Sequence, residues 1–158
     1  MRRLLLALAA ALATALPARA QSIQAGPGTE LSSLIGQSLN VPFVVDMTAR
    51  PEKLGAFAMR IAWNPAVLRF ENGLRGTFGS VTVNGDSITQ GVMRLAGASP
   101  AGAGGLVTVA VSRFTPLLAD TTTIQVALTE LFAAGSFADL LPSATVRSGL
   151  YCPARGRY

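Results

Sequence analysis

The sequence has 158 residues, with 13 Lys or Arg against 8 Asp or Glu, a formal net charge of +5, and no histidine. The lack of histidine excludes Ser-His-Asp and Cys-His catalysis and any His-ligated zinc or iron site. Cys152 is the single cysteine, which excludes an intramolecular disulfide and an iron–sulfur cluster.

Residues 1–20 have the pattern of a cleaved signal peptide. A basic start, MRR, precedes an apolar run from Leu4 to Leu16, and the letters ARA that end at Ala20 form an A-x-A cleavage signature. The apolar run is shorter than the roughly 20 residues that a membrane-spanning helix needs. We therefore expect cleavage after Ala20, a secreted or periplasmic product, and no membrane span in the mature chain.

Removal of this leader changes the charge balance. Three of the 13 basic residues lie in it, so 10 basic against 8 acidic residues would leave a net charge of +2. Binding to nucleic acid needs clustered Lys and Arg. The mature chain lacks such clusters, and we expect no nucleic-acid partner.

The mature chain is rich in period-two alternation of apolar and polar residues, which is typical of strands with one buried face. Asn-Pro, Asn-Gly and Gly-rich turns separate the alternating runs. Eight or nine short strands in this arrangement predict an all-β sandwich or barrel. We expect one domain over residues 21–152, with Ser99–Gly105 as a flexible loop and residues 153–158 as a flexible tail. The clearest of the expected strands are Gln37–Met47, Ala56–Trp63, Ser80–Asn84, Gly91–Ala96, Val107–Ser112, Ile124–Thr129 and Thr145–Tyr151.

The alternation also predicts which side chains are buried. Trp63 is in register with the apolar face of its run, so Arg60 and the alanines on either side of it must face outward. The predicted core is Leu39, Val41, Phe43, Val45, Phe57, Met59, Ile61, Trp63, Leu68, Phe70, Val109, Val111, Ile124, Val126 and Leu128.

The order of these segments resembles the cohesin domain family. The resemblance covers about Ser22 to Tyr151. One strand begins with Gly, a small residue and a hydrophobic residue, and it ends with an aromatic residue before an Asn-Pro turn. Strands that begin with Gly follow it. The matching segments are LGAFAMRIAWNPAVLRFENG from Leu54, GVMRLAGAS from Gly91, GGLVTVAVSRF from Gly104, TTIQVALTEL from Thr122 and ATVRSGLY from Ala144. The chain departs from the family in its high alanine and low acid content.

The resemblance implies a nine-stranded jelly-roll β-sandwich, in a superfamily that also contains carbohydrate-binding modules. Cohesins are not catalysts, and they bind dockerin modules in assemblies that degrade extracellular polysaccharide. In the family one sheet face, made by the third, fifth, sixth and eighth strands, meets the partner. On this chain those strands would be Gly55–Trp63, Ser80–Asn84, Gly91–Ala96 and Thr122–Leu131.

On that face we predict a partner-binding surface of small side chains with a few polar anchors. The two arginines could bind carbonyl or carboxylate groups of a protein partner. An ordinary solvated sheet face is an equally good interpretation, because exposed Arg and Thr are common on sheets. The predicted anchors are Arg60, Thr82, Arg94, Gln125 and Thr129.

The sequence is compatible with three other functions. A carbohydrate-binding module is the main alternative, although a planar row of Trp or Tyr for sugar stacking is not evident. A structural component of the cell envelope is the second. Catalysis ranks last, because no two acids are spaced as a general acid/base pair. Turn carboxylates could hold a structural calcium ion, but no D-x-D-x-D-G loop is present, and we expect no cofactor.

The leader generates the first prediction. Intact-mass measurement and N-terminal sequencing of the protein from its native host should show a chain that begins at Gln21 and is found outside the cytoplasm. A mature protein that still begins at Met1 would contradict this interpretation.

Overall fold

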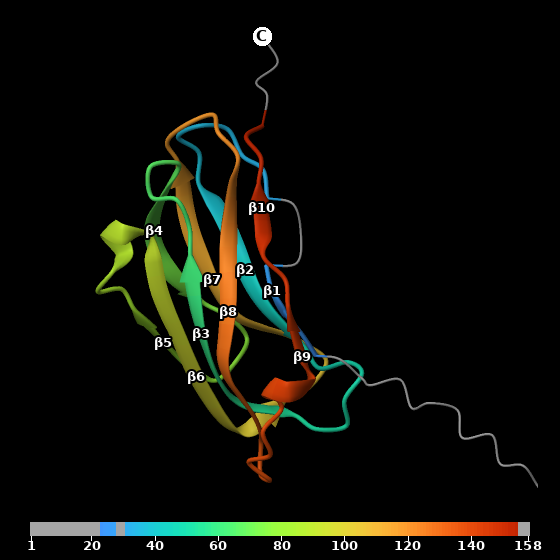
Figure 1. Cartoon of the computed structure of the whole chain (residues 1–158). Coiled ribbons are helices and arrows are strands. Elements are labelled where there is room, and N and C mark those ends of the chain that lie inside the picture. The colour runs from blue at the N-terminus through green and yellow to red at the C-terminus, as the bar shows by residue number, and fades with distance from the viewer. Residues whose placement is uncertain (1–22, 28–30, 155–158) are drawn as a thin grey trace, which may run out of the picture.

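The computed structural model describes residues 23–27 and 31–154, which form ten strands and two short 3-10 helices (Figure 1). The helices are η1 (Ile88–Gln90) and η2 (Leu141–Ser143). The strands are β1 (Ile23–Gly26), β2 (Leu39–Asp46), β3 (Leu54–Ala62), β4 (Leu68–Arg75), β5 (Ser80–Asn84), β6 (Val92–Ala103), β7 (Leu106–Pro116), β8 (Thr122–Ala133), β9 (Ala144–Val146) and β10 (Gly149–Tyr151).

The strands make two five-stranded sheets, in the orders β4-β7-β2-β1-β9 and β10-β8-β3-β6-β5. Strand β1 pairs with β9 in parallel, and the other strand pairs are antiparallel. The predicted jelly-roll β-sandwich is confirmed. The run Thr145–Tyr151, expected as one strand, instead divides at residues 147–148 into β9 and β10, which belong to different sheets.

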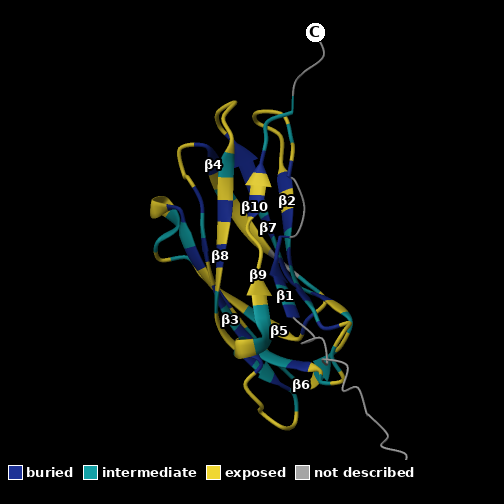
Figure 2. Ribbon diagram, turned by 45° about the vertical axis from the view of Figure 1, so that its right-hand side comes forward, coloured by how far each residue is buried: buried dark blue, intermediate teal, exposed yellow. Residues whose placement is uncertain are grey.

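The hydrophobic core lies between the two sheets. Phe43 on β2 and Phe57, Met59 and Ile61 on β3 are buried, as the alternation predicted. Bands of buried and exposed residues follow one another along β8 in Figure 2. Phe70 and Leu128, two further predicted core residues, are partly buried and pack against this core.

The prediction for Val111 is wrong, because a β-bulge reverses the alternation in β7. Phe43 pairs with Ala110 and Val44 with Thr108, so Val109 is the extra residue on β7. Beyond the bulge Ala110 is buried and Val111 is only half-buried. The inserted residue moves each following side chain to the opposite face.

The prediction of a flexible loop at Ser99–Gly105 is also wrong. Strand β6 continues to Ala103, which pairs with Leu54 at the far end of β3. The turn to β7 is confined to Gly104 and Gly105, and Gly105 has a φ of 72°. A small residue is required within this strand, because a Cβ atom at Gly102 would collide with the side chains of Ala134 and Lys53. Composition alone therefore suggested flexibility where pairing imposes order.

The expected leader, residues 1–20, lies outside the described residues, as does the part of the expected tail from residue 155. Within residues 23–27 and 31–154, we find no helix with the length and apolar character needed to cross a bilayer. Cys152 is half-buried and its thiol is not in a disulfide.

The side chain of Trp63, just after β3, packs against residues of the opposite sheet. Its side chain is 6% exposed, and its indole N–H donates to the carbonyl oxygen of Leu68 at 2.8 Å. The ring meets Phe114 of the opposite sheet edge-to-face, with ring centres 5.2 Å apart. Aromatic pairs in this geometry add to the free energy gained from burial.

Trp63→Ala should lower the free energy of unfolding by about 3–5 kcal/mol, because it leaves a large cavity between the sheets and an unpaired carbonyl at Leu68. Urea unfolding followed by circular dichroism measures the loss, and Trp63→Phe, which refills most of the volume, should recover much of it. A loss below about 1 kcal/mol would show that Trp63 is not a core residue.

Candidate functional site

The candidate site is the outer face of the β8-β3-β6-β5 sheet, called the outer face below. The family resemblance predicted that these four strands share one sheet, and the structure confirms that they do. All five predicted anchor residues are exposed on these strands. They are Arg60 on β3, Thr82 on β5, Arg94 on β6, and Gln125 and Thr129 on β8. Their role in binding stays a prediction.

Alanines make the middle of the outer face flat. Ala58 on β3 pairs with Ala96 on β6, and the next outward pair is Ala56 with Ala98. Ala127 on β8 lies opposite Arg60. Side chains of this size let another backbone approach closely, and they lose little side-chain entropy when a partner covers them.

A bulge in β8 gives Thr129 a structural contact. Ala58 pairs with Glu130 and Met59 with Leu128, so Thr129 is the extra residue on β8. Its hydroxyl donates to the carbonyl oxygen of Ala58 at 3.1 Å. Thr129 therefore stabilises the bulge, and the bulge exposes Glu130 as well. Sequence alternation did not indicate Glu130 as part of this face.

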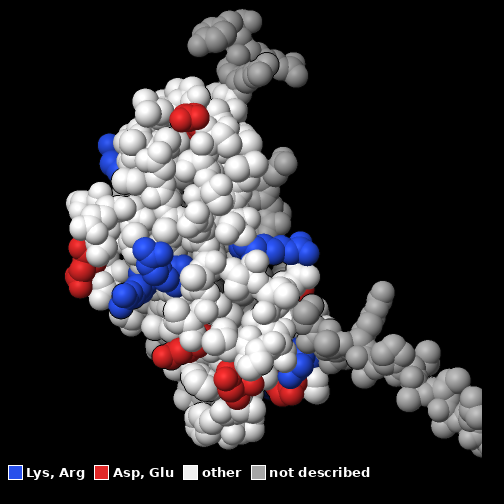
Figure 3. Space-filling view, in the orientation of Figure 1, with Lys and Arg blue, Asp and Glu red and all other residues white. Residues whose placement is uncertain are grey.

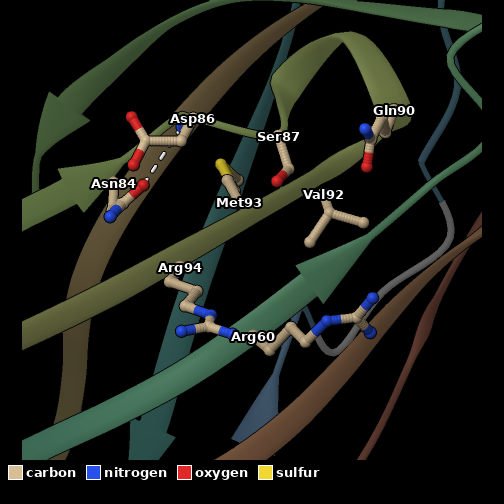
Figure 4. Close-up of a pocket in the computed structure, with 8 residues that line it drawn as sticks. All are labelled: Arg60, Asn84, Asp86, Ser87, Gln90, Val92, Met93 and Arg94. Atoms are coloured by element: carbon tan, nitrogen blue, oxygen red, sulfur yellow. Dashed lines mark hydrogen bonds between the residues drawn. The ribbon is translucent and has the colours of Figure 1, made fainter.

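Arg60 and Arg94 lie directly opposite each other on β3 and β6, with Asn84 of β5 next in register. They line a hollow of about 340 Å³ at the turn around η1, together with Asn84, Asp86, Ser87, Gln90, Val92 and Met93 (Figure 4). Figure 3 looks onto the outer face and shows a basic cluster over β3 and β6, with acidic groups to its left and below it. Two residues of like charge therefore lie opposite each other on adjacent strands.

Gly91 shapes one end of this hollow. It has a φ of 72°, and a Cβ atom there would collide with the carbonyl oxygen of Trp63. The carbonyl oxygen of Gly91 accepts a 2.8 Å hydrogen bond from the Trp63 backbone N–H. The turn from η1 into β6 therefore packs tightly against the end of β3. This contact fixes the position of the turn residues that line the hollow.

An apolar hollow of about 240 Å³ lies at the other end of the outer face. Its lining includes Ala56, Ala98, Phe132 and Phe137. Phe137 is 80% exposed and has a φ of 55°, a backbone conformation that a bulky side chain rarely adopts. Sequence reasoning missed Phe137, because neither its exposure nor its backbone conformation follows a strand pattern.

The short turn around Phe137 is held by hydrogen bonds. Its backbone N–H donates to the carbonyl oxygen of Ala133 at 3.2 Å, and the Ala133 N–H donates to the carbonyl oxygen of Ala138 at 2.9 Å. Strained residues of this kind persist only where the surroundings fix them, and they are frequent at binding sites. The turn presents a large apolar ring to solvent.

Carboxylates with a shifted pKa lie away from this face and hold local structure. The hydroxyl of Thr48, and then its backbone N–H, lower the pKa of Asp46 by hydrogen bonding to its carboxylate. Hydrogen bonds from Arg69 and then Thr115 lower the pKa of Glu71. Among the described residues, acids, cysteine and histidine form no cluster of three or more that could hold a metal ion.

Comparison with known proteins identifies the fold. No protein-family model matches the sequence, and no curated protein matches it. Among solved structures, the chain is similar to a non-cellulosomal cohesin from Archaeoglobus fulgidus, with 15% identity, a TM-score of 0.68, and coverage of 85% of this chain and 91% of that one. The chain therefore has the cohesin fold.

Two bacterial structures agree. The seventh ScaB type I cohesin of Pseudobacteroides cellulosolvens has 9% identity and a TM-score of 0.72, with coverage of 87% of this chain and 95% of that one. A chain of a type I cohesin–dockerin complex from Clostridium thermocellum has 7% identity and a TM-score of 0.72, with coverage of 84% and 99%. At these identities the likeness concerns the fold alone.

The facing arginines generate a stability prediction that does not depend on any partner. Like charges directly opposite in a sheet are destabilising, so Arg60→Gln or Arg94→Gln should raise the free energy of unfolding by about 0.2–1 kcal/mol at low salt. The two gains should not add, because either substitution removes the same repulsion. Denaturant unfolding of both single variants and the double variant measures this.

The gain should shrink at about 1 M salt, where the Debye length falls to about 3 Å. Arg113→Gln, on β7 in the other sheet, is the control and should not stabilise the protein, because Arg113 donates to Asn40 at 3.3 Å. Additive gains that persist at high salt would mean that the two guanidinium groups do not interact.

Proposed function

We propose that this protein is an exported, non-catalytic binding module whose outer face binds a protein partner of the dockerin type. The observation that carries the proposal is the outer face itself. Exposed anchors at Arg60, Arg94 and Phe137 surround a flat alanine surface, in a fold shared with proteins solved as cohesin–dockerin complexes. A flat central surface with a few long anchors suits protein docking.

Arg60, Arg94 and Phe137 are the side chains that we expect to contribute most of the binding energy. Arginine and aromatic residues dominate the energetics of protein interfaces, and small neighbours that exclude water support them. The anchors stand on both sides of the alanines, so a partner that touches them all must cover the whole face. Thr82 and Gln125 would lie at the polar rim.

Burial of the larger aromatic rings argues against direct sugar binding. Sugar rings stack on flat, exposed aromatic faces, but Trp63 and Tyr151 lie in the core. The Tyr151 hydroxyl donates to the carbonyl oxygen of Ser33 at 3.1 Å, and burial raises the pKa of this phenol. In this proposal any link to polysaccharide breakdown is indirect, through enzymes that carry the partner module.

Export to the periplasm or the medium is part of the same proposal. It rests on the leader pattern that ends at Ala20. Partner and module would then meet outside the cytoplasm, where the fold does not depend on a disulfide, since Cys152 is the one cysteine.

The proposal is tested by titration of the mature protein with each purified dockerin module encoded by the organism that makes it, using isothermal titration calorimetry. We expect one module or more to bind with a 1:1 stoichiometry. Arg60→Ala and Phe137→Ala should each weaken binding by more than about 1 kcal/mol without lowering the melting temperature.

Leu106→Ala is the matched control for Phe137→Ala. Leu106 is 68% exposed and lies on β7 in the other sheet, so its loss removes exposed apolar surface without touching the outer face. Binding that survives the combined loss of Arg60, Arg94 and Phe137 would refute the assigned face. Failure of every dockerin module to bind would refute the dockerin-type partner.

A further inference from the structure

We infer that Arg60 and Arg94 form a binding site for a carboxylate, and that the partner supplies it as an Asp or Glu side chain. This inference rests on the proposed function and names the chemistry of the partner. The outer face would then select an acidic partner surface.

The first argument is the absence of a countercharge. Within residues 23–27 and 31–154, neither Arg60 nor Arg94 forms an ion pair with an acid. Two other arginines do lie against an acid, since Arg50 contacts Glu52 at 3.1 Å and Arg69 contacts Glu71 at 2.9 Å. The protein therefore leaves the two facing guanidinium groups without an acid.

The second argument is the position of the two groups. A cross-strand pair of like charges costs folding free energy, and an anion placed between them would turn that repulsion into attraction from both sides. In Figure 4 the guanidinium groups of Arg60 and Arg94 point apart, so one carboxylate would contact both only after one of the two flexible side chains rotates. Each guanidinium can present parallel N–H groups to a carboxylate.

The third argument is the hollow that adjoins the pair. Its neutral polar lining, Asn84, Ser87 and Gln90, can donate further hydrogen bonds to a bound oxygen. Asp86 is the acid of the hollow, and Figure 4 places its carboxylate at the rim opposite the two guanidinium groups. The Asp86 backbone N–H donates to the Asn84 side chain at 3.0 Å, which fixes this turn.

The flat alanines decide between two sources of the carboxylate. Ala58 and Ala96, the next pair along the strands, let a partner backbone come close enough for a short acidic side chain to reach both arginines. An acidic polysaccharide would also carry carboxylates, but its sugar rings would gain no stacking contact beside the arginines, because Phe137 lies at the distant end of the face. The observations therefore favour a protein carboxylate.

The test starts with the full mature protein and a small probe, glutarate, followed through the side-chain Nε–H signals of arginine in NMR spectra. We expect saturable shifts of the Arg60 and Arg94 signals, and a several-fold weaker affinity in Arg60→Gln or Arg94→Gln. Arg113→Gln is the matched control and should leave glutarate binding unchanged. Glutaramide, which has the same shape without charge, should not shift either signal.

The second stage uses the dockerin-type module that binds the protein. Arg60→Glu and Arg94→Glu should each weaken that complex by about tenfold or more, because they place an acid opposite the partner's acid. Replacing the contacting Asp or Glu of the module with Lys should restore affinity toward the reversed-charge variants and lower it toward the unmodified protein. Such a charge swap is specific to a direct contact.

The outcomes separate this inference from the proposed function. A module that binds unmodified protein and the Arg→Glu variants equally well would overturn the acidic contact and leave the binding function in place. Glutarate shifts without binding by any module would refute the dockerin-type partner. Tighter binding of trigalacturonate than of glutarate, at the same two arginines, would overturn the protein carboxylate in favour of an acidic polysaccharide.

Discussion

The burial of one face of β3 is the constraint on which the rest of this molecule depends. Phe57, Met59 and Ile61 point into the space between the sheets and are almost fully enclosed. Since successive side chains of a strand point to opposite faces, this row forces Arg60 and the alanines beside it outward. A shift of the pairing register by one residue would bury Arg60 without a countercharge. The free-energy cost of burying an unpaired charge excludes that alternative register.

The same strand positions its neighbours, because β3 pairs with β6 on one side and β8 on the other. The register that buries Met59 beside Leu95 brings Arg60 beside Arg94. The repulsion between those arginines is thus a consequence of the register that fills the core. A chain selected for stability alone would place an acid or a neutral residue at one of the two positions. The proposed carboxylate contact would offset this repulsion.

Much of this arrangement could be predicted from the alternation along each strand. The buried side of Phe57–Trp63 and the outward position of Arg60 could be predicted from the sequence, because an unbroken pattern of period two covers Ala56–Trp63. The membership of β3, β5, β6 and β8 in one sheet came from the family resemblance and not from the alternation. A local pattern contains no information on which strands pair.

The bulges and the exposed ring could not be predicted in this way. In a bulge, two residues of one strand lie opposite a single residue of the partner strand. The burial of Ala110 and the exposure of Glu130 therefore depend on long-range pairing. The order of Ser99–Gly105 likewise comes from pairing with β3, against its glycine-rich composition. Phe137 is exposed by a strained turn, for which the residue type carries no signal.

The most direct test of this account is a cross-saturation NMR experiment on the complex with a dockerin-type module, in which the module is irradiated and signal loss is mapped on the amides of this protein. We predict that the loss is centred on β3 and β6 around Arg60 and Arg94, extends to the turn at Phe137, and is absent from β4, β7 and β2. Signal loss centred on the β4-β7-β2 face, or on the loops alone, would contradict the account.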